Sequence, residues 1–271
     1  MTLAAPSAIL EGVGLHSGAD ASLRLLPAPT GTGLVFRLLP GGQEIRACAA
    51  NVTDTSRCTR LGAGGAEVQT VEHVLSALAG LSVDDAVIEL TGGEVPAADG
   101  SAAPFVTLIE NAGLRPLETY VAALTLTQPL YLADGHSSII ALPAEKFSAT
   151  VVLDYPKHLY LGTLAAVFDE ETDDYAALIA PARTFGFLSE IDALRARGLG
   201  LGATRENAVV LGEDCYETPL RFPNELARHK LLDLIGDMAL VGRPLRMALF
   251  AVKPGHTLNT RLASLLSPDL S

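Results

Sequence analysis

Residues 225–237 read Glu225-Leu-Ala-Arg-His-Lys-Leu-Leu-Asp-Leu-Ile-Gly-Asp237. Apolar side chains recur at helical spacing along this run and no proline interrupts it, so the pattern predicts an amphipathic helix. His229, Asp233 and Asp237 lie at i, i+4 and i+8, which places them on one side of that helix. An imidazole and a carboxylate at this spacing can bind one divalent cation. The same pattern also occurs on solvated helix faces, so other parts of the chain must decide between a metal site and a solvated face.

A second stretch, residues 70–80, also predicts a helix. It reads Thr70-Val-Glu-His-Val-Leu-Ser-Ala-Leu-Ala-Gly80, with Thr70 as a plausible N-cap and Gly80 suited to the C-terminal cap. Glu72 and His73 then fall in the first turn. A structural interpretation exists for both residues, since a glutamate there complements the helix dipole and a histidine can simply be a satisfied polar residue.

Composition excludes several classes of protein. The chain has 271 residues, 49% hydrophobic and 18% charged, which is typical of a globular protein. A formal net charge of -12 without a Lys- or Arg-rich run disfavours nucleic acid or an anionic membrane as a partner. We expect a small-molecule substrate and a monomeric protein.

The N-terminus and the cysteines bear on the compartment. The first residues lack the charged start and apolar run of a signal peptide, and about 18 uncharged apolar residues occur nowhere in succession. This predicts a cytoplasmic protein without a transmembrane segment. Cys48, Cys58 and Cys215 show no C-x-x-C spacing, so neither a disulfide framework nor a thiolate metal site is indicated.

Turn signals divide the chain into two α+β halves. Arg115-Pro116 interrupts the pattern and an extended run restarts at Val121, so we place a boundary near residue 118, between domains 1–117 and 118–271. Each half has a helix that carries a histidine and is followed by a strand. This weak self-similarity predicts two α+β layers of common plan, whose histidine-bearing helices face one another across the interface.

The candidate metal ligands are His73, His229 and Asp233. Two histidines and one carboxylate with an open position form a hydrolytic zinc arrangement, in which zinc lowers the pKa of water to about 7 and polarises a carbonyl. Glu72 could then take the proton of the water. His256, which follows a Pro-Gly turn, could protonate the leaving amine or steady the oxyanion, and Asp237 could orient it.

Gly12-Val-Gly-Leu-His-Ser-Gly18 places His16 between glycines, where the backbone can approach a ligand closely, although a plain turn with an exposed histidine is equally compatible. We take His16 as a candidate substrate contact.

Six motifs together resemble one family. They are the Gly12–Gly18 run, Thr70-Val-Glu-His73, Asp99-Gly-Ser-Ala102, Arg183-Thr-Phe-Gly-Phe187, the 228–237 run and Gly255-His-Thr-Leu-Asn259. In this order they are similar to the motifs of UDP-3-O-acyl-N-acetylglucosamine deacetylases, the zinc enzymes of lipid A synthesis in Gram-negative bacteria. The resemblance implies two α+β domains, each a sheet with a helical layer, with the helices packed between the two sheets.

The resemblance also implies a role for single residues. It gives His73, His229 and Asp233 as zinc ligands, Glu72 as general base, and His256 with Asp237 as the acid or electrostatic group. Thr184 would help hold the oxyanion, Lys230 would lie near the substrate, and Phe185 and Phe187 near the sugar. Ala98 departs from the family, which usually has a methionine before Asp-Gly-Ser.

Residues 188–210 form an apolar insertion in the second half. The resemblance makes this insertion a passage for the acyl chain, lined by Leu188, Ile191, Ala208 and Val210. The alternative is a miniature core under a loop. As a whole, the sequence predicts a deacetylase with one catalytic Zn²⁺, for which Fe²⁺ could substitute. A zinc deacetylase of another N-acetyl sugar and a non-catalytic binding module on the same scaffold remain alternatives.

Overall fold

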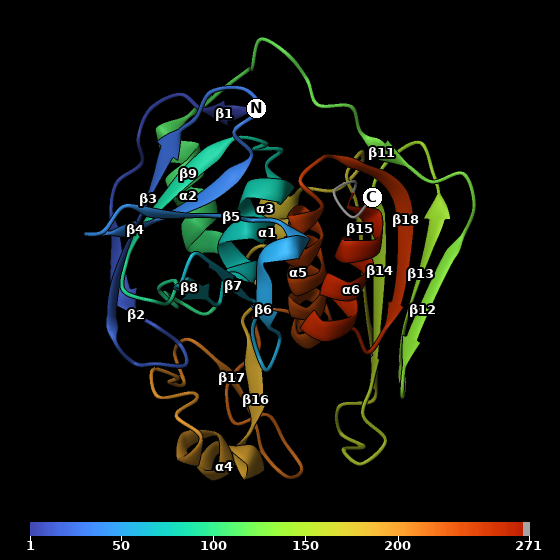
Figure 1. Ribbon diagram of the computed structural model, residues 1–271. Helices are drawn as coiled ribbons and strands as arrows, with labels where there is room; N and C mark the ends of the chain where they lie inside the picture. Colours follow the sequence, from blue (N-terminus) through green and yellow to red (C-terminus); the bar gives the residue numbers. More distant parts are fainter. Residues whose placement is uncertain (268–271) are drawn as a thin grey trace.

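The computed structural model describes residues 1–267, in which two β-sheets enclose a layer of helices (Figure 1). In spatial order, the strands of the first sheet are β2 (Leu10–Val13), β3 (Asp20–Pro27), β9 (Ala86–Thr91), β4 (Leu34–Leu39) and β5 (Gln43–Arg46). Those of the second are β12 (Leu130–Asp134), β13 (Ser137–Pro143), β18 (Leu245–Val252), β14 (Ser148–Asp154) and β15 (Thr163–Asp169), and β11 (Leu124–Thr125) pairs with β18. The predicted α+β class, with helices between two sheets, is confirmed.

The two sheets share one topology. In each sheet, the central strand comes from a late part of the corresponding half of the sequence. It is antiparallel to one neighbouring strand and parallel to the other. Strand β9 does so between β3 and β4, and β18 does so between β13 and β14. This common plan confirms the self-similarity predicted from the sequence.

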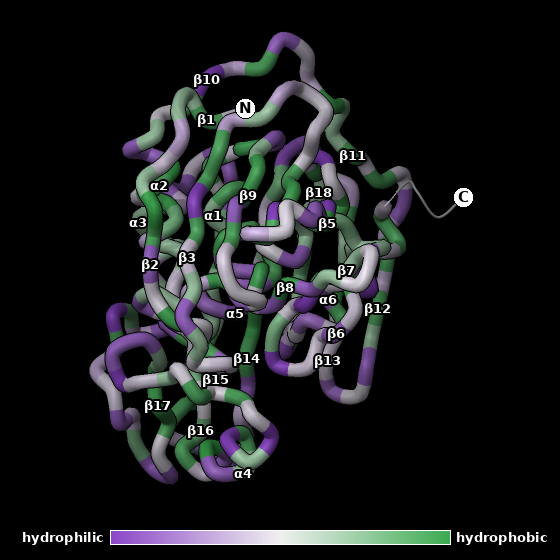
Figure 2. Tube along the Cα trace, turned by 60° about the vertical axis from the view of Figure 1, so that its left-hand side comes forward, coloured by the Kyte–Doolittle hydropathy of each residue, from purple (hydrophilic) through white to green (hydrophobic). Residues whose placement is uncertain are grey.

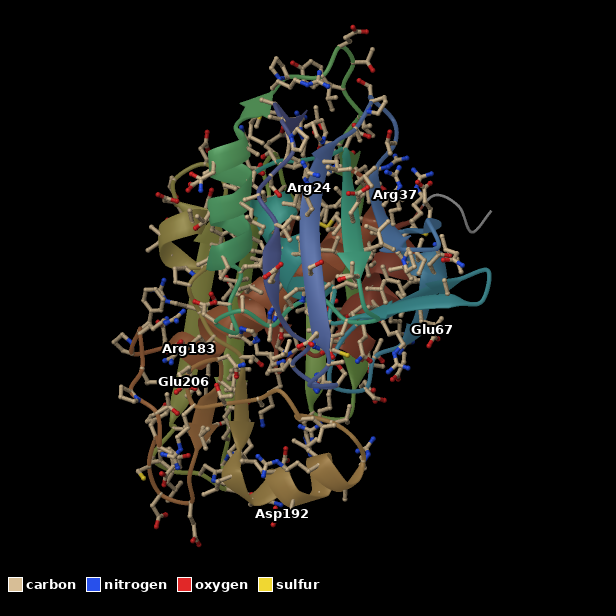
Figure 3. All side chains as sticks on the ribbon, turned by 90° about the vertical axis from the view of Figure 1, so that its left-hand side faces the viewer. Arg24, Arg37, Glu67, Arg183, Asp192 and Glu206 are labelled. Atoms are coloured by element: carbon tan, nitrogen blue, oxygen red, sulfur yellow. The ribbon has the colours of Figure 1, made fainter. Side chains whose placement is uncertain are left out.

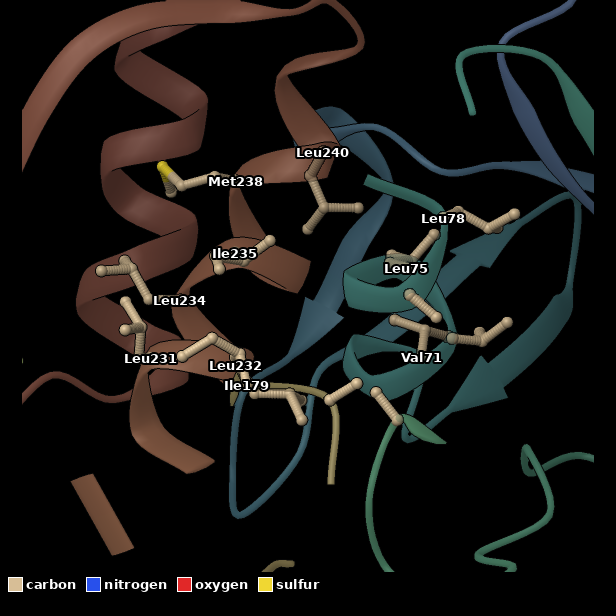
Figure 4. Close-up of a cluster of buried hydrophobic side chains, with 14 of the residues drawn as sticks. Val71, Leu75, Leu78, Ile179, Leu231, Leu232, Leu234, Ile235, Met238 and Leu240 are labelled. Carbon is tan, nitrogen blue, oxygen red and sulfur yellow. The ribbon is translucent and has the colours of Figure 1, made fainter. Parts of the chain in front are cut away.

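Five helices lie in or beside the central layer: α1 (Glu72–Gly80), α2 (Ala103–Ala112), α3 (Tyr175–Leu178), α5 (Glu225–Met238) and α6 (His256–Leu266). The buried residues Leu75, Leu232 and Ile235 belong to the cluster where α1 meets α5 (Figure 4). A Cβ added at Gly236 would lie 2.1 Å from the carbonyl oxygen of Glu72, so glycine is what allows α5 to approach the start of α1 this closely. The two histidine-bearing helices therefore face one another, as predicted. None of the helices within residues 1–267 is long and apolar enough to cross a membrane.

Each half has an insertion at the same topological place, between the edge strand of its sheet and its central helix. The first insertion contains the 3-10 turn η1 (Ala49–Asn51) and the strands β6 (Val52–Asp54), β7 (Arg60–Ala63) and β8 (Ala66–Gln69). The second contains β16 (Phe185–Phe187), the 3-10 turn η2 (Leu188–Glu190), α4 (Ile191–Ala196) and β17 (Val209–Leu211). Figure 2 places the apolar segments of β16 and β17 together at one end of the molecule, beside α4. A further 3-10 turn, η3 (Ala239–Val241), follows α5.

The predicted N-cap of α1 is wrong. Val71 precedes the helix, and Thr70 has a positive φ of 59°. The Thr70 hydroxyl donates instead to Oε1 of Glu94 at 2.8 Å, because this buried carboxylate lies beside the turn and takes the donor that capping would need.

The segment between β10 (Leu114–Arg115) and β11 runs from the first sheet to the second (Figure 1). Strand β10 pairs with β1 (Thr2–Leu3) at the start of the chain. We keep the division into domains 1–117 and 118–271 as a proposal, because the predicted boundary falls in this connection.

Candidate metal centre and active site

Three buried side chains from the two facing helices meet at the centre of the molecule. His229 and Asp233 come from adjacent turns of α5, and His73 comes from the first turn of α1. Their ligand atoms all lie within 4.8 Å of one another. Oδ1 of Asp233 lies 3.4 Å from Nε2 of His229 and 3.8 Å from Nε2 of His73. The polar side of α5 is therefore enclosed between helices, and the alternative of a solvated face is excluded for these residues.

The hydrogen bonds of this cluster orient its side chains in a way that fits a cation. Nδ1 of His229 donates to the carbonyl oxygen of Ala182 at 3.0 Å, which turns Nε2 toward Asp233. Lys230 donates to Oδ2 of Asp233 at 2.8 Å. Oδ1 of Asp233 is buried and has no hydrogen-bond partner within residues 1–267. A buried carboxylate oxygen that faces two imidazole nitrogens fits a divalent metal ion, whose positive charge supplies the missing partner.

The protonation states also suit a cation. Burial and the neighbouring His229 lower the pKa of His73 to about 3, and burial lowers the pKa of His229. Burial alone would raise the pKa of Asp233, but His229 and Lys230 hold it below its ordinary range. The cluster therefore presents neutral imidazoles and an ionised carboxylate near neutral pH, which are the forms that bind metal.

Glu72 lies beside the metal cluster at the start of α1. Its Oε2 accepts a hydrogen bond from the backbone N–H of Thr59 at 3.0 Å, while Oε1 lies 3.8 Å from Nε2 of His256. Burial raises the pKa of Glu72 to about 7, with the charge of His256 opposing this rise and that of Asp233 adding to it. A carboxyl group with a pKa near neutrality is suited to accept and release a proton.

His256 begins α6 and forms a pair with Asp237. Nδ1 of His256 donates to Oδ2 of Asp237 at 2.9 Å, and Asn259 donates to the same oxygen at 2.9 Å. Burial would lower the pKa of His256, but Asp237 and Glu72 raise it to about 9. The imidazole is therefore positively charged at neutral pH, so it can donate a proton or stabilise negative charge.

A cavity of about 780 Å³ joins these groups to the second insertion. All predicted site residues except Asp237 line it, and Asp237 lies behind His256. From the central helices the cavity is lined by Glu72, His73, His229, Lys230, Asp233 and His256. From the Gly12–Gly18 turn and the second insertion it is lined by His16, Thr184, Phe185, Phe187, Leu188, Ile191, Ala208 and Val210.

The turn that carries His16 contacts the second insertion. The backbone N–H groups of Leu201 and Gly202 donate to the carbonyl oxygens of His16 and Leu15, each at 3.1 Å. A Cβ added at Gly202 would lie 2.2 Å from the carbonyl oxygen of Gly14. This turn and the second insertion therefore approach each other closely, and His16 lines the cavity beside their contact. A contact of His16 with the substrate stays a prediction.

Sequence reasoning missed the residues that hold the site residues in place through hydrogen bonds and ion pairs. Arg183 forms a buried ion pair with Glu225 at 2.9 Å, which fixes the segment that carries the Ala182 carbonyl. Glu94 accepts from the backbone N–H groups of His16 and Ser17, each at 2.8 Å. Thr59 contacts both Glu72 and Asp237. Arg183 stood in a quoted motif, but nothing in the local pattern around Glu94 or Thr59 indicates these long-range contacts.

Comparison with known proteins agrees with this geometry. The family model described as LpxC, UDP-3-O-acyl N-acetylglycosamine deacetylase, matches residues 1–267. The chain is 43% identical to the UDP-3-O-acyl-N-acetylglucosamine deacetylase of Leptospira biflexa over 98% of this chain and 89% of that protein. It is 43% identical to the protein of that name from Myxococcus xanthus, over 97% of this chain and 85% of the other. For Saccharophagus degradans the identity is 42%, over 92% of this chain and 84% of the relative.

Proposed function

This chain belongs to the UDP-3-O-acyl-N-acetylglucosamine deacetylase family of lipid A biosynthesis, and we propose that its cavity hydrolyses the N-acetyl group with one Zn²⁺ held by His73, His229 and Asp233. The observation that carries the proposal is Oδ1 of Asp233, which has no hydrogen-bond partner within residues 1–267 and faces the imidazoles of His229 and His73. The other carboxylate oxygen, Oδ2, lies 3.9 Å from Nε2 of His256. A structural zinc site is usually closed by four protein ligands and has no use for an adjacent base and acid. When bound, zinc would supply Lewis acidity that lowers the pKa of water and polarises the amide carbonyl.

We propose that Glu72 and His256 each carry out one proton transfer of the reaction. Glu72 takes a proton from the attacking water, whose oxygen forms a bond to the acetyl carbon. The C–N bond breaks, His256 gives a proton to the amine nitrogen, and acetate leaves. Asp237 holds the His256 ring by its Nδ1–H, and the Thr184 hydroxyl and the Lys230 ammonium line the same cavity, where negative charge develops on oxygen.

We propose that the second insertion binds the acyl chain. A miniature core would bury Leu188, Ile191, Ala208 and Val210, but Leu188 is 47% exposed and the other three are only half-buried. All four line the cavity, whereas Asp192 on the next position of α4 points away from the body of the protein (Figure 3). An apolar wall that the protein itself leaves partly uncovered is suited to a hydrocarbon chain.

Changing that wall should separate acylated from unacylated substrates. Each buried methylene contributes about 0.8 kcal/mol, so loss of a whole acyl chain should lower kcat/KM by orders of magnitude. Ile191→Glu should therefore depress acetate release from the acylated UDP-sugar far more than from UDP-N-acetylglucosamine, with unchanged metal content. Asp192→Asn, on the outward side of the same helix, is the control. Equal losses on both substrates would contradict the passage.

The pH dependence of kcat/KM should be bell-shaped. Glu72 must be ionised, so activity rises with pH through its pKa of about 7, which a bound cation would shift downward. His256 must be protonated, so activity falls as pH rises through about 9. The two groups interact, so the profile reports apparent values for the pair. His256→Ala should remove the basic limb, and an unchanged basic limb in that variant would reject its role.

Metal analysis combined with a deacetylation assay tests the proposed function. The purified protein should contain one equivalent of zinc and release acetate from the UDP-3-O-acyl sugar. Release from a different N-acetyl sugar alone would favour the second candidate enzyme, and zinc without acetate release would favour a binding module. Reconstitution with Fe²⁺ measures whether iron can replace zinc. A cytoplasmic location and a monomeric state remain predictions from the sequence.

A further inference from the structure

We infer that Thr59 is a positioning residue that holds the base Glu72 and the Asp237–His256 pair in one fixed arrangement. The inference rests on the proposed function, because it assigns a purpose to contacts around the proposed base and acid. Thr59 lies directly before β7 in the first insertion and is completely buried. It contacts residues from α1, α5 and α6, which are far apart in the sequence.

The backbone of Thr59 fixes Glu72. Its N–H donates to Oε2 of Glu72 at 3.0 Å, and its carbonyl oxygen accepts from the N–H of Val71 at 3.4 Å. One oxygen of the carboxylate is therefore tied back to the insertion. The other, Oε1, lies 3.8 Å from Nε2 of His256, and both residues line the cavity. This division leaves one oxygen of the base available to a substrate water.

The side chain of Thr59 fixes Asp237. The hydroxyl donates to Oδ1 of Asp237 at 2.6 Å, while Oδ2 accepts from Nδ1 of His256 and from Asn259. Donors on both oxygens set the plane of the carboxylate, and that plane in turn sets the direction of the His256 ring. The Thr59 oxygen also lies 3.3 Å from Nδ1 of His256, the nitrogen that donates to Asp237, so the hydroxyl contacts both members of the pair.

Burial makes this hydroxyl hard to replace. Asp237 and Thr59 are both completely buried, so bulk water cannot supply the donor that Oδ1 would lose. Without it, the carboxylate can rotate toward the remaining donors, and the His256 imidazole follows. The distance between His256 and Glu72 would then no longer be fixed, and the step that passes a proton to the amine should suffer more than substrate binding.

Thr59→Val tests this inference, because it keeps the branched shape and removes the hydroxyl. We expect kcat to fall by about tenfold to a hundredfold, with KM and zinc content unchanged, and Thr59→Ser to restore most of kcat. Ser76→Ala is the matched control. Its buried hydroxyl lies on α1 and contacts the Tyr175 hydroxyl of α3 and the Leu232 carbonyl oxygen of α5. Ser76 does not line the cavity, so loss of this hydroxyl should lower stability and leave kcat unchanged.

A spectroscopic readout separates positioning from folding and from the function itself. In zinc-loaded protein labelled with a heavy nitrogen isotope in histidine, the Nδ1–H signal of His256 should shift or broaden in Thr59→Val and stay in place in Ser76→Ala and Thr59→Ser. An unchanged signal together with unchanged kcat in Thr59→Val would overturn the inference, as would a Thr59→Ser variant as impaired as the valine variant. If the unmutated protein releases no acetate, the proposed function fails, while the signal still decides whether Thr59 orients His256.

Discussion

Replacing His229 with alanine should remove most of the bound metal and most of the activity together. The proposed site has three protein ligands, and the ring of His229 is oriented by its hydrogen bond to the Ala182 carbonyl, which places Nε2 3.4 Å from Oδ1 of Asp233. The cluster is buried, so after the substitution only His73 and Asp233 of the proposed ligand set remain to hold the ion. Metal analysis of the purified variant and an acetate-release assay measure both losses.

The control for this prediction is a histidine outside the cluster. His136 is exposed in the turn between β12 and β13, and His136→Ala should leave metal content unchanged. A His229→Ala variant that keeps stoichiometric zinc and full turnover would show that the ligand assignment is wrong. Loss of activity with full retention of zinc would indicate that His229 contacts the substrate and does not bind the metal.

Helix α5 explains how much of the site a sequence can reveal. The spacing of His229, Asp233 and Asp237 is local information, because helix geometry alone puts i, i+4 and i+8 on one side. The amphipathic pattern, however, indicates a polar side in water, and that side is buried here. The difference comes from α1, which covers it and approaches closely at Gly236. Burial of a polar face depends on its partner, and the helix itself carries no sign of it.

The contacts behind the site are the part that sequence reasoning could not reach. The Thr70 hydroxyl bonds to Glu94, and the Thr59 hydroxyl bonds to Asp237. Each pairing joins residues from different elements, so neither propensity nor periodicity contains it. For Thr70 the local rule even gave a wrong result, because a threonine before a helix is an ordinary N-cap and only the tertiary position of Glu94 redirects it.

The insertion at residues 188–210 shows a third situation. Its apolar composition is visible in the sequence, but composition cannot distinguish side chains that cover one another from side chains that line a space. The exposure of Leu188 and the half-burial of Ile191 in the structure favour a space. The choice between a miniature core and a cavity wall depends on which side chains are buried. A short irregular segment has no sequence periodicity that would predict this burial.

Replacing Glu72 with glutamine should lower kcat by about 10²- to 10⁴-fold, the usual contribution of a general base, with metal content retained. Glutamine keeps the size of the side chain, and its amide oxygen can still accept the N–H of Thr59, as Oε2 of Glu72 does. What it loses is the ability to accept a proton from water. Glu72 is outside the His73–His229–Asp233 ligand set, so zinc should remain bound. Single-turnover acetate release and metal analysis on the same sample measure the two effects separately.

The control for this prediction is the substitution of a carboxylate on the surface. Glu67 on β8 is exposed and lies 3.7 Å from Arg60, so Glu67→Gln removes the same charge without touching the cavity and should leave kcat unchanged. Substantial turnover in Glu72→Gln would transfer the role of base to another group, such as His256, whose Nε2 lies 3.8 Å from Oε1 of Glu72. The raised pKa of His256 makes it a poor base at neutral pH, because it already carries the proton that it would have to accept. The proposed acid and base roles agree with the environments of these two residues, because burial raises the pKa of Glu72 to about 7 and Asp237 raises the pKa of His256 to about 9.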